Sequence, residues 1–101
     1  MTSAKRSALA PDLPTIAETG LEGFEVSGWY GLAAPAATPA AAVERLNGET
    51  NRALKSTAVL AELRGQGLEP VGDTPAEATA FIGAEVARWT AIIRDAGIKS
   101  Q

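Results

Sequence analysis

The segment Thr74–Glu77 carries the strongest local structural signal in this sequence. Thr74 can cap a helix that begins at Pro75, and Glu77, three residues after the cap, completes a capping box. We predict a helix over 75–96, with Gly97 as its C-terminal cap. Its large apolar side chains recur one, three or four residues apart, which predicts a continuous buried stripe. The stripe consists of Phe81, Ile82, Val86, Trp89, Ile92 and Ile93.

The chain has little material from which to build a core. Its 101 residues can form at most one domain. Hydrophobic residues make up 46% of it, but aromatic residues only 5%, and many of the apolar side chains are alanines. A core of small side chains buries less area per residue than one rich in Phe and Ile. The free energy of folding of this chain by itself is therefore expected to be small.

Residues 24–33 are predicted to form the main β-strand. Gly28 within this segment indicates a bulge or a close approach of another backbone. A second, short strand is predicted over 68–71, at the edge of a sheet because Pro70 has no N–H to donate. The strand-forming side chains of the main segment are Phe24, Val26, Trp29, Tyr30 and Leu32.

Two more helices complete the predicted fold. Thr38 is expected to cap a helix over 39–56, with Pro39 as its first residue. A short helix is expected over 57–65. The predicted fold class is therefore α/β, with one main strand, one short edge strand and three helices.

Residues 1–22 are predicted to be a loop that contains one helical turn over 14–20. The adjacent Lys5 and Arg6, with serines on either side, can hold a carboxylate or a phosphate. A solvated basic loop is the simpler interpretation, because these side chains stand alone rather than in a basic stripe.

Trp29 and Tyr30 allow two interpretations. Amphipathic aromatic side chains fill seams between packed layers, and they also line ligand clefts. Trp89, by contrast, belongs to a helical stripe and is most simply a core residue. The residues themselves favour a core role for Trp29 and Tyr30 over a cleft role, without excluding the cleft.

Composition excludes several classes of function. The sequence contains no His and no Cys, which removes histidine acid–base catalysis, thiol nucleophiles and most metal ligation. A net charge of −3 argues against nucleic-acid binding. No apolar run approaches the roughly 20 residues of a membrane span. No nucleophile is paired with a base, so we expect no catalytic residue, no metal and no cofactor.

The order of several short motifs resembles one family, the receptors of the tripartite tricarboxylate transporter system, also called TctC or Bug proteins. The resemblance covers nearly the whole chain and is to the C-terminal third of such a receptor. The motifs are TSAKRS at 2–7, LPTIAETGLEGF at 13–24, WYGLAAP at 29–35, RLN at 45–47, GLEPVG at 67–72 and TPAE at 74–77.

The resemblance implies a periplasmic, non-catalytic receptor with two α/β lobes that close on a small carboxylate and deliver it to a membrane permease. Residues 1–101 then form a single incomplete domain. Residues 1–22 come from the end of the second lobe, and residues 23–101 supply a crossing strand and the C-terminal helices of the first lobe.

Four residues are predicted to contact the solute. Thr2 and Ser3 offer hydroxyl and backbone N–H groups to a carboxylate, and Trp29 and Tyr30 wall the cleft. Lys5 and Arg6 are a second choice, because the family shape places them beyond the end of a strand.

The sequence departs from the family pattern because it corresponds to only one third of a receptor. A crossing strand without its sheet exposes unpaired backbone groups, so we expect an intertwined homodimer. The alternative function is a small self-associating α/β interaction protein without a small-molecule ligand. The first residues contain no apolar signal region, so a protein produced as it stands is expected in the cytoplasm.

Overall fold

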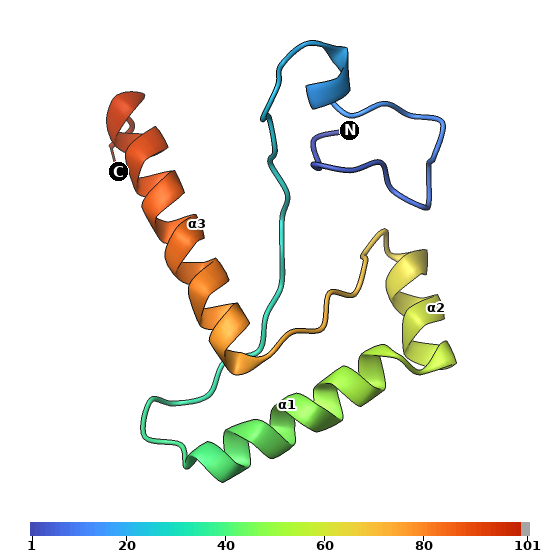
Figure 1. Ribbon diagram of the computed structural model, residues 1–101, viewed down its shortest axis with the longest axis vertical. Helices are drawn as coiled ribbons and strands as arrows, with labels where there is room; N and C mark the ends of the chain where they lie inside the picture. Colours follow the sequence, from blue (N-terminus) through green and yellow to red (C-terminus); the bar gives the residue numbers. More distant parts are fainter. Residues whose placement is uncertain (100–101) are drawn as a thin grey trace.

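The computed structural model describes residues 1–99 and consists of helices joined by extended segments (Figure 1). A short 3₁₀-helix, η1, lies in the N-terminal region, and three α-helices follow from residue 40 onward. Their bounds are Ala17–Thr19 for η1, Ala40–Leu54 for α1, Thr57–Gly65 for α2 and Pro75–Asp95 for α3.

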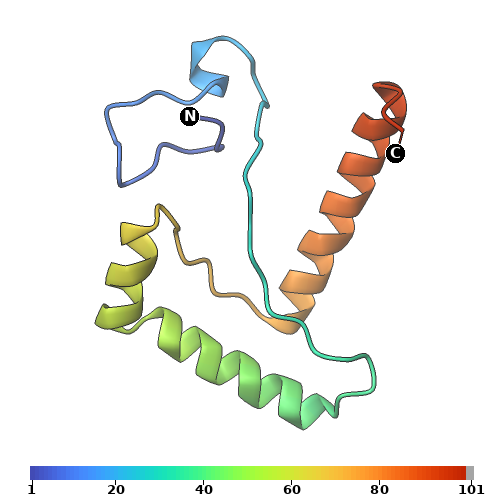
Figure 2. The same cartoon turned by 180° about the vertical axis from the view of Figure 1, so that it is seen from behind.

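The helices form an open frame (Figures 1 and 2). α1 forms the base, and α2 stands at its C-terminal end. α3 rises from near the middle of α1, where Asn47 and Asn51 bind the Asp73 C=O. The segment between η1 and α1 runs as a long, nearly straight trace through the opening of this frame. The N-terminal loop lies beyond the C-terminal end of α2, and the extended trace separates it from α3. The three helices thus surround an extended connection rather than a shared core.

The predicted start of α3 is confirmed. The Glu77 N–H donates to Thr74 Oγ1 at 3.2 Å, and the Thr74 N–H donates to Glu77 Oε2 at 2.8 Å. At the other end Ala96, not Gly97, is the cap residue. Gly97 follows with φ of 66°, while the Ile98 N–H donates to the Ile93 C=O at 3.0 Å. This left-handed residue lets the backbone turn back over the last carbonyls of the helix.

Of the other two helices, one was predicted correctly and the other differs by one or two residues at its ends. α2 has the predicted bounds and is capped by Ser56, whose hydroxyl accepts from the Val59 N–H. α1 begins one residue later than predicted because Pro39, with ψ of 138°, is its cap rather than its first residue. It ends at Leu54 because Ser56 must leave the helix to cap the next one.

The two predicted strands are wrong. Among residues 1–99 there is no strand, so the architecture is helical rather than α/β. Residues 24–33 run extended, but a strand requires a ladder of hydrogen bonds to a neighbour, and this segment has one such backbone bond, from the Val26 N–H to the Thr2 C=O. Residues 68–71 likewise form no ladder of backbone hydrogen bonds with another described segment. The expected close approach at Gly28 is also absent, since no described atom lies within 4 Å of a Cβ built there.

The predicted buried stripe on α3 is exposed. Its members range from 36% exposed at Trp89 to 61% at Val86, and no hydrophobic residue in the described part of the protein is fully buried. The Cα radius of gyration is 16.6 Å, against about 13 Å for a compact domain of this length. The frame therefore keeps its shape without a hydrophobic core of its own.

Hydrogen bonds from side chains to the backbone and to one another hold the frame together instead. The side-chain amides of Asn47 and Asn51, one turn apart on α1, both donate to the Asp73 C=O, at 2.8 and 2.9 Å. On the far side, Ser7 Oγ donates to Glu69 Oε1 at 2.6 Å and ties the N-terminal loop to the segment after α2. These bonds position the start of α3 and the N-terminal loop relative to α1 and α2.

Candidate functional site

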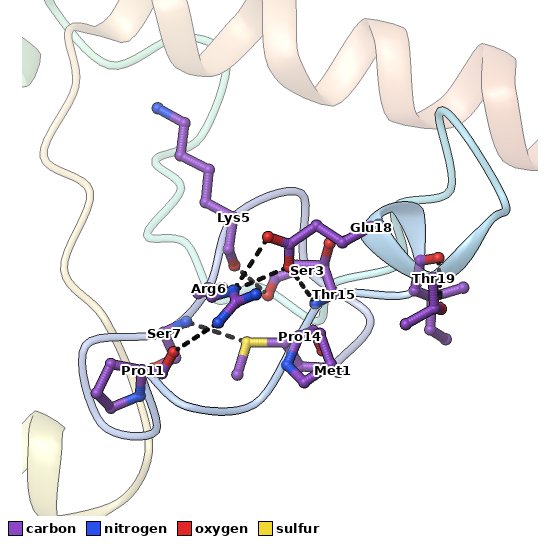
Figure 3. Close-up of polar contacts among 11 residues, drawn as sticks. Met1, Ser3, Lys5, Arg6, Ser7, Pro11, Pro14, Thr15, Glu18 and Thr19 are labelled. Carbon is purple, nitrogen blue, oxygen red and sulfur yellow. Dashed lines mark hydrogen bonds and ion pairs between the residues drawn. The ribbon is translucent and has the colours of Figure 1, made fainter.

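The two hydroxyl residues predicted to hold a carboxylate lie at the start of the N-terminal loop. Thr2 is exposed, and its backbone carbonyl accepts the Val26 N–H at 2.8 Å. Ser3 is half-buried, and its hydroxyl donates to the Lys5 C=O at 2.7 Å (Figure 3). The Ser3 hydroxyl proton is therefore already used within the loop, whereas Thr2 keeps its side chain toward solvent.

The two aromatic residues predicted to wall a cleft differ in their surroundings. The Trp29 ring meets the Phe81 ring edge-on, with centroids 5.3 Å apart and planes at 78°. It is still 46% exposed, so one side of the indole remains accessible. Tyr30 is 88% exposed and contributes almost its whole ring to the surface. Trp29 is anchored to α3, and Tyr30 is not packed on the described part of the protein.

Thr2 and Ser3 lie on one segment, and Trp29 and Tyr30 lie on a neighbouring one. The bond between Val26 and Thr2 joins the segments, and Trp29 follows Val26 by three residues, about 10 Å of extended backbone. The structure joins the segments that carry Thr2 and Trp29, but neither residue lines one of the grooves described below. Which of the four residues contacts a solute stays a prediction.

Arg6 is a structural residue. Its guanidinium donates to both carboxylate oxygens of Glu18 at 3.0 Å and to the Pro11 C=O at 3.2 Å (Figure 3). Lys5 extends away from this cluster in the same view. Of the two basic residues, only Lys5 has a charged group that is not engaged by the described residues, which leaves Lys5 as the available cation of this loop.

The organising residue of the N-terminal loop is Thr15, the single fully buried residue among those described, at 2% exposure. Its hydroxyl accepts the Glu18 N–H at 3.2 Å, and its own N–H donates to Glu18 Oε2 at 2.7 Å. The Arg6 hydrogen bond first, and the Thr15 N–H second, lower the pKa of Glu18 below its ordinary value. This cluster was not predicted, although Thr15 and Glu18 have the spacing of a capping box.

A second polar cluster was also missed. On α3, the 15%-exposed Glu85 carboxylate accepts from Arg88 Nη1 at 3.3 Å and from Trp89 Nε1 at 3.1 Å. Arg88 also donates to the Glu25 C=O in the extended segment. Spacings of three and four residues on a helix were the available signal. The cluster fixes the start of the extended segment against α3.

Two shallow grooves lie away from the four predicted residues. One, of about 400 Å³, is lined by the end of α1, by α2 and by residues 70–72, and the other, of about 200 Å³, lies between the N-terminal loop and residues 64–70. Within residues 1–99 no three acidic residues gather in a way that could hold a metal ion. None of the described helices is long and apolar enough to cross a membrane.

A model of the tripartite tricarboxylate transporter family receptor matches residues 1–98. The protein is 38% identical over 97 residues to Protein BugT of Bordetella pertussis, covering 96% of this sequence and 30% of the relative. It is 40% identical over 94 residues to a protein of Pseudomonas sp. strain P51 encoded in the tcbD–tcbE intergenic region, covering 92% of this sequence and 28% of the relative.

A solved structure has a similar fold. R. palustris Rpa4515, solved with adipate, is 38% identical and superposes with a TM-score of 0.79, over 95% of this protein and 32% of that one. The sequence thus spans about 30% of the length of the curated relatives it matches.

Proposed function

Because this chain belongs to the tripartite tricarboxylate transporter receptor family, we propose that it supplies part of a solute-binding receptor for small carboxylates. Proteins of this family are solute-binding receptors rather than enzymes. The observation that carries the proposal is the similarity to R. palustris Rpa4515, whose structure contains the dicarboxylate adipate. The role proposed for this protein is binding without catalysis.

The junction between Thr2 and Val26 is the proposed place of solute contact. There the exposed Thr2 hydroxyl lies next to the extended segment that carries the accessible faces of Trp29 and Tyr30. Hydroxyl and backbone N–H groups suit a carboxylate, and aromatic faces suit the carbon atoms between two carboxylates. Lys5, whose side chain extends away from the loop, adds positive charge at longer range.

Family membership also supports a proposal for the cellular location and the transport partners of the receptor. A receptor of this type works in the periplasm and passes its solute to the membrane subunits of a transporter. We propose both for the intact receptor that contains residues 1–98.

The test grafts residues 1–98 in place of the matched part of R. palustris Rpa4515 and measures adipate binding by calorimetry. Thr2→Val, Ser3→Ala, Trp29→Ala and Tyr30→Ala are then compared. We expect at least a tenfold loss of affinity for Trp29→Ala. Lys55→Ala, in the 400 Å³ groove, is the control and should change affinity less than twofold. Unchanged affinity in all four variants would reject the assignment of the site.

The exposed apolar surface favours a second candidate for this protein alone, a self-associating interaction protein that binds no small molecule. The exposure of α3 and of the extended segment supports the proposal that isolated copies form a homodimer. Light scattering on the isolated protein tests it, and a monodisperse folded monomer at micromolar concentration would contradict it.

A further inference from the structure

Two hydrogen bonds connect the N-terminal loop, residues 1–22, with the rest of the described structure. The Val26 N–H donates to the Thr2 C=O at 2.8 Å, and Ser7 Oγ donates to Glu69 Oε1 at 2.6 Å. The second bond lies where the loop passes the segment that follows α2 (Figures 1 and 2). The groove of about 200 Å³ lies there as well, so the loop is not tightly packed on the helices at this point.

The connection between the loop and the extended segment contains two glycines with left-handed backbone. Gly20 has φ of 121° and Gly23 has φ of 75°. Glycine adopts such angles without a steric penalty, and a hinge needs a few residues whose backbone angles can change. The Thr2–Val26 bond lies close to this connection and can act as a pivot. Rotation of the loop about this pivot is then opposed by the bond between Ser7 and Glu69.

The N-terminal loop is bonded internally, so it is expected to rotate as one body. Arg6, the neighbour of Ser7, donates to both carboxylate oxygens of Glu18 in η1 at 3.0 Å. Ser3 Oγ donates to the Lys5 C=O at 2.7 Å. Because these bonds join the start of the loop to η1, Ser3 and Lys5 change position together with Ser7.

Both members of the Ser7–Glu69 pair are held by their own segments. The Ser7 hydroxyl oxygen accepts the Leu9 N–H at 3.2 Å and donates its proton to Glu69. Next to Glu69, the Leu68 N–H donates to the Leu63 C=O at 2.8 Å and fixes the start of this segment on the end of α2. A hydrogen bond between groups that are already oriented costs little conformational entropy, and a carboxylate acceptor strengthens it.

We propose that Ser7 and Glu69 are a positioning pair. Their hydrogen bond sets the angle of the N-terminal loop on the frame, and thereby the distance from Ser3 and Lys5 to the extended segment that carries Trp29. The consequence for solute binding rests on the proposed function, in which the loop and the extended segment contact the same solute. A loop that rotates would occupy the binding position for only part of the time, and the apparent affinity would fall by that fraction.

Spin labels can measure the position of the loop directly. The sequence contains no cysteine, so Asp12→Cys in the loop and Ala61→Cys on α2 provide two exposed label sites. Labelled protein is diluted into excess unlabelled protein, so that distances between copies do not contribute. We expect one narrow distance distribution, whose population falls at least twofold in Ser7→Ala and in Glu69→Ala. The double variant should match the single ones, because each substitution removes the same bond.

Two further variants separate positioning from a general loss of structure. Ser7→Thr keeps the hydroxyl and should retain the narrow distribution. Glu44→Ala removes a carboxylate from the exposed surface of α1 and should also leave the distribution unchanged. Helicity by circular dichroism should be equal in all variants, because the helix caps lie elsewhere. Equal distance distributions in Ser7→Ala, Glu69→Ala and Glu44→Ala would overturn the proposal.

The same variants in the graft of residues 1–98 into R. palustris Rpa4515 test the effect on solute binding. Ser7→Ala and Glu69→Ala should weaken adipate binding at least twofold, whereas Ser7→Thr and Glu44→Ala should not. Altered label distances with unchanged adipate affinity would overturn the positioning role. A graft that binds no adipate would count against the proposed function alone, because the label distances are measured without a solute.

Discussion

Trp29 lies edge-on against Phe81, with ring centroids 5.3 Å apart, and this pair is the one aromatic contact between the extended segment and α3 within residues 1–99. Trp29 was predicted as either a core residue or a cleft wall. In the structure it has a part of each role, because the ring packs on α3 while 46% of the residue stays accessible. A residue held in this way can contact a solute without losing its orientation.

Phe81→Ala should release Trp29 from α3. Edge-to-face pairs contribute about 0.5–1.5 kcal/mol beyond their buried area, so the loss should be measurable even in a small frame. In a Trp89→Phe background, we expect the Trp29 fluorescence maximum to move to longer wavelength. Val86→Ala, in the row turned away from the extended segment, serves as the control and should leave the Trp29 spectrum unchanged.

Acid should open the N-terminal loop. Arg6 and the Thr15 N–H lower the pKa of Glu18 from its ordinary 4.5, so the folded loop favours the ionised form. The contribution of Glu18 to stability is therefore present above pH 4.5 and is lost as the pH falls from there through the lowered pKa. Amide exchange at Thr15, expressed relative to the intrinsic exchange rate at each pH, should become faster over this range. In Glu18→Gln it should be fast already at neutral pH, while Glu22→Gln should behave as the unaltered protein; a Thr15 amide that stays protected in acid would contradict the account.

Gly72 and Gly48 should respond in opposite directions to alanine. Gly72 has φ of 66°, and a Cβ there would lie 3.3 Å from Asn51 Oδ1, so Gly72→Ala should disturb the bonds to the Asp73 C=O. Gly48 lies inside α1 with no atom near its Cβ position, and Gly48→Ala should stabilise the helix by about 0.5–1 kcal/mol. Circular dichroism melting of the two variants checks both directions; a gain in both would mean that the left-handed turn is not needed.

Thr74→Ala should shorten α3 from its N-terminus. The Thr74 hydroxyl accepts the Glu77 N–H, and loss of such a cap costs typically about 1 kcal/mol. Thr79→Ala is the matched control, because the Thr79 hydroxyl donates to the Pro75 C=O within the helix and alanine is a better helix former. We expect lower helicity for Thr74→Ala and equal or higher helicity for Thr79→Ala by circular dichroism.

The helices were predictable because their signals are local. The Thr74–Glu77 box and the Ser56 cap each act within one turn, so the sequence around them contains all the information they require. The same holds for the turn within 14–20, which corresponds to η1. The missed cluster around Thr15 has a local spacing too, but its third member, Arg6, comes from outside the turn.

The candidate site was less predictable. Thr2, Ser3, Trp29 and Tyr30 were chosen from resemblance, and the structure places them on two joined segments without enclosing a solute. Nothing in the spacing of Arg6 and Glu18 showed that Arg6 is bound within its own loop, twelve residues from its partner. The choice of Lys5 over Arg6 as the available cation required the tertiary structure.

The sequence by itself determined where the α-helices begin and end to within two residues, and the family to which the protein belongs, because caps and ordered motifs are read along the sequence. Tertiary structure alone decided that residues 24–33 are extended without being a strand, and that the stripe on α3 is exposed. A strand and a buried face both need a second surface, and in this protein no described residue supplies one. The frame is held open instead by hydrogen bonds to distant backbone carbonyls. Two side-chain amides and one guanidinium donate these bonds.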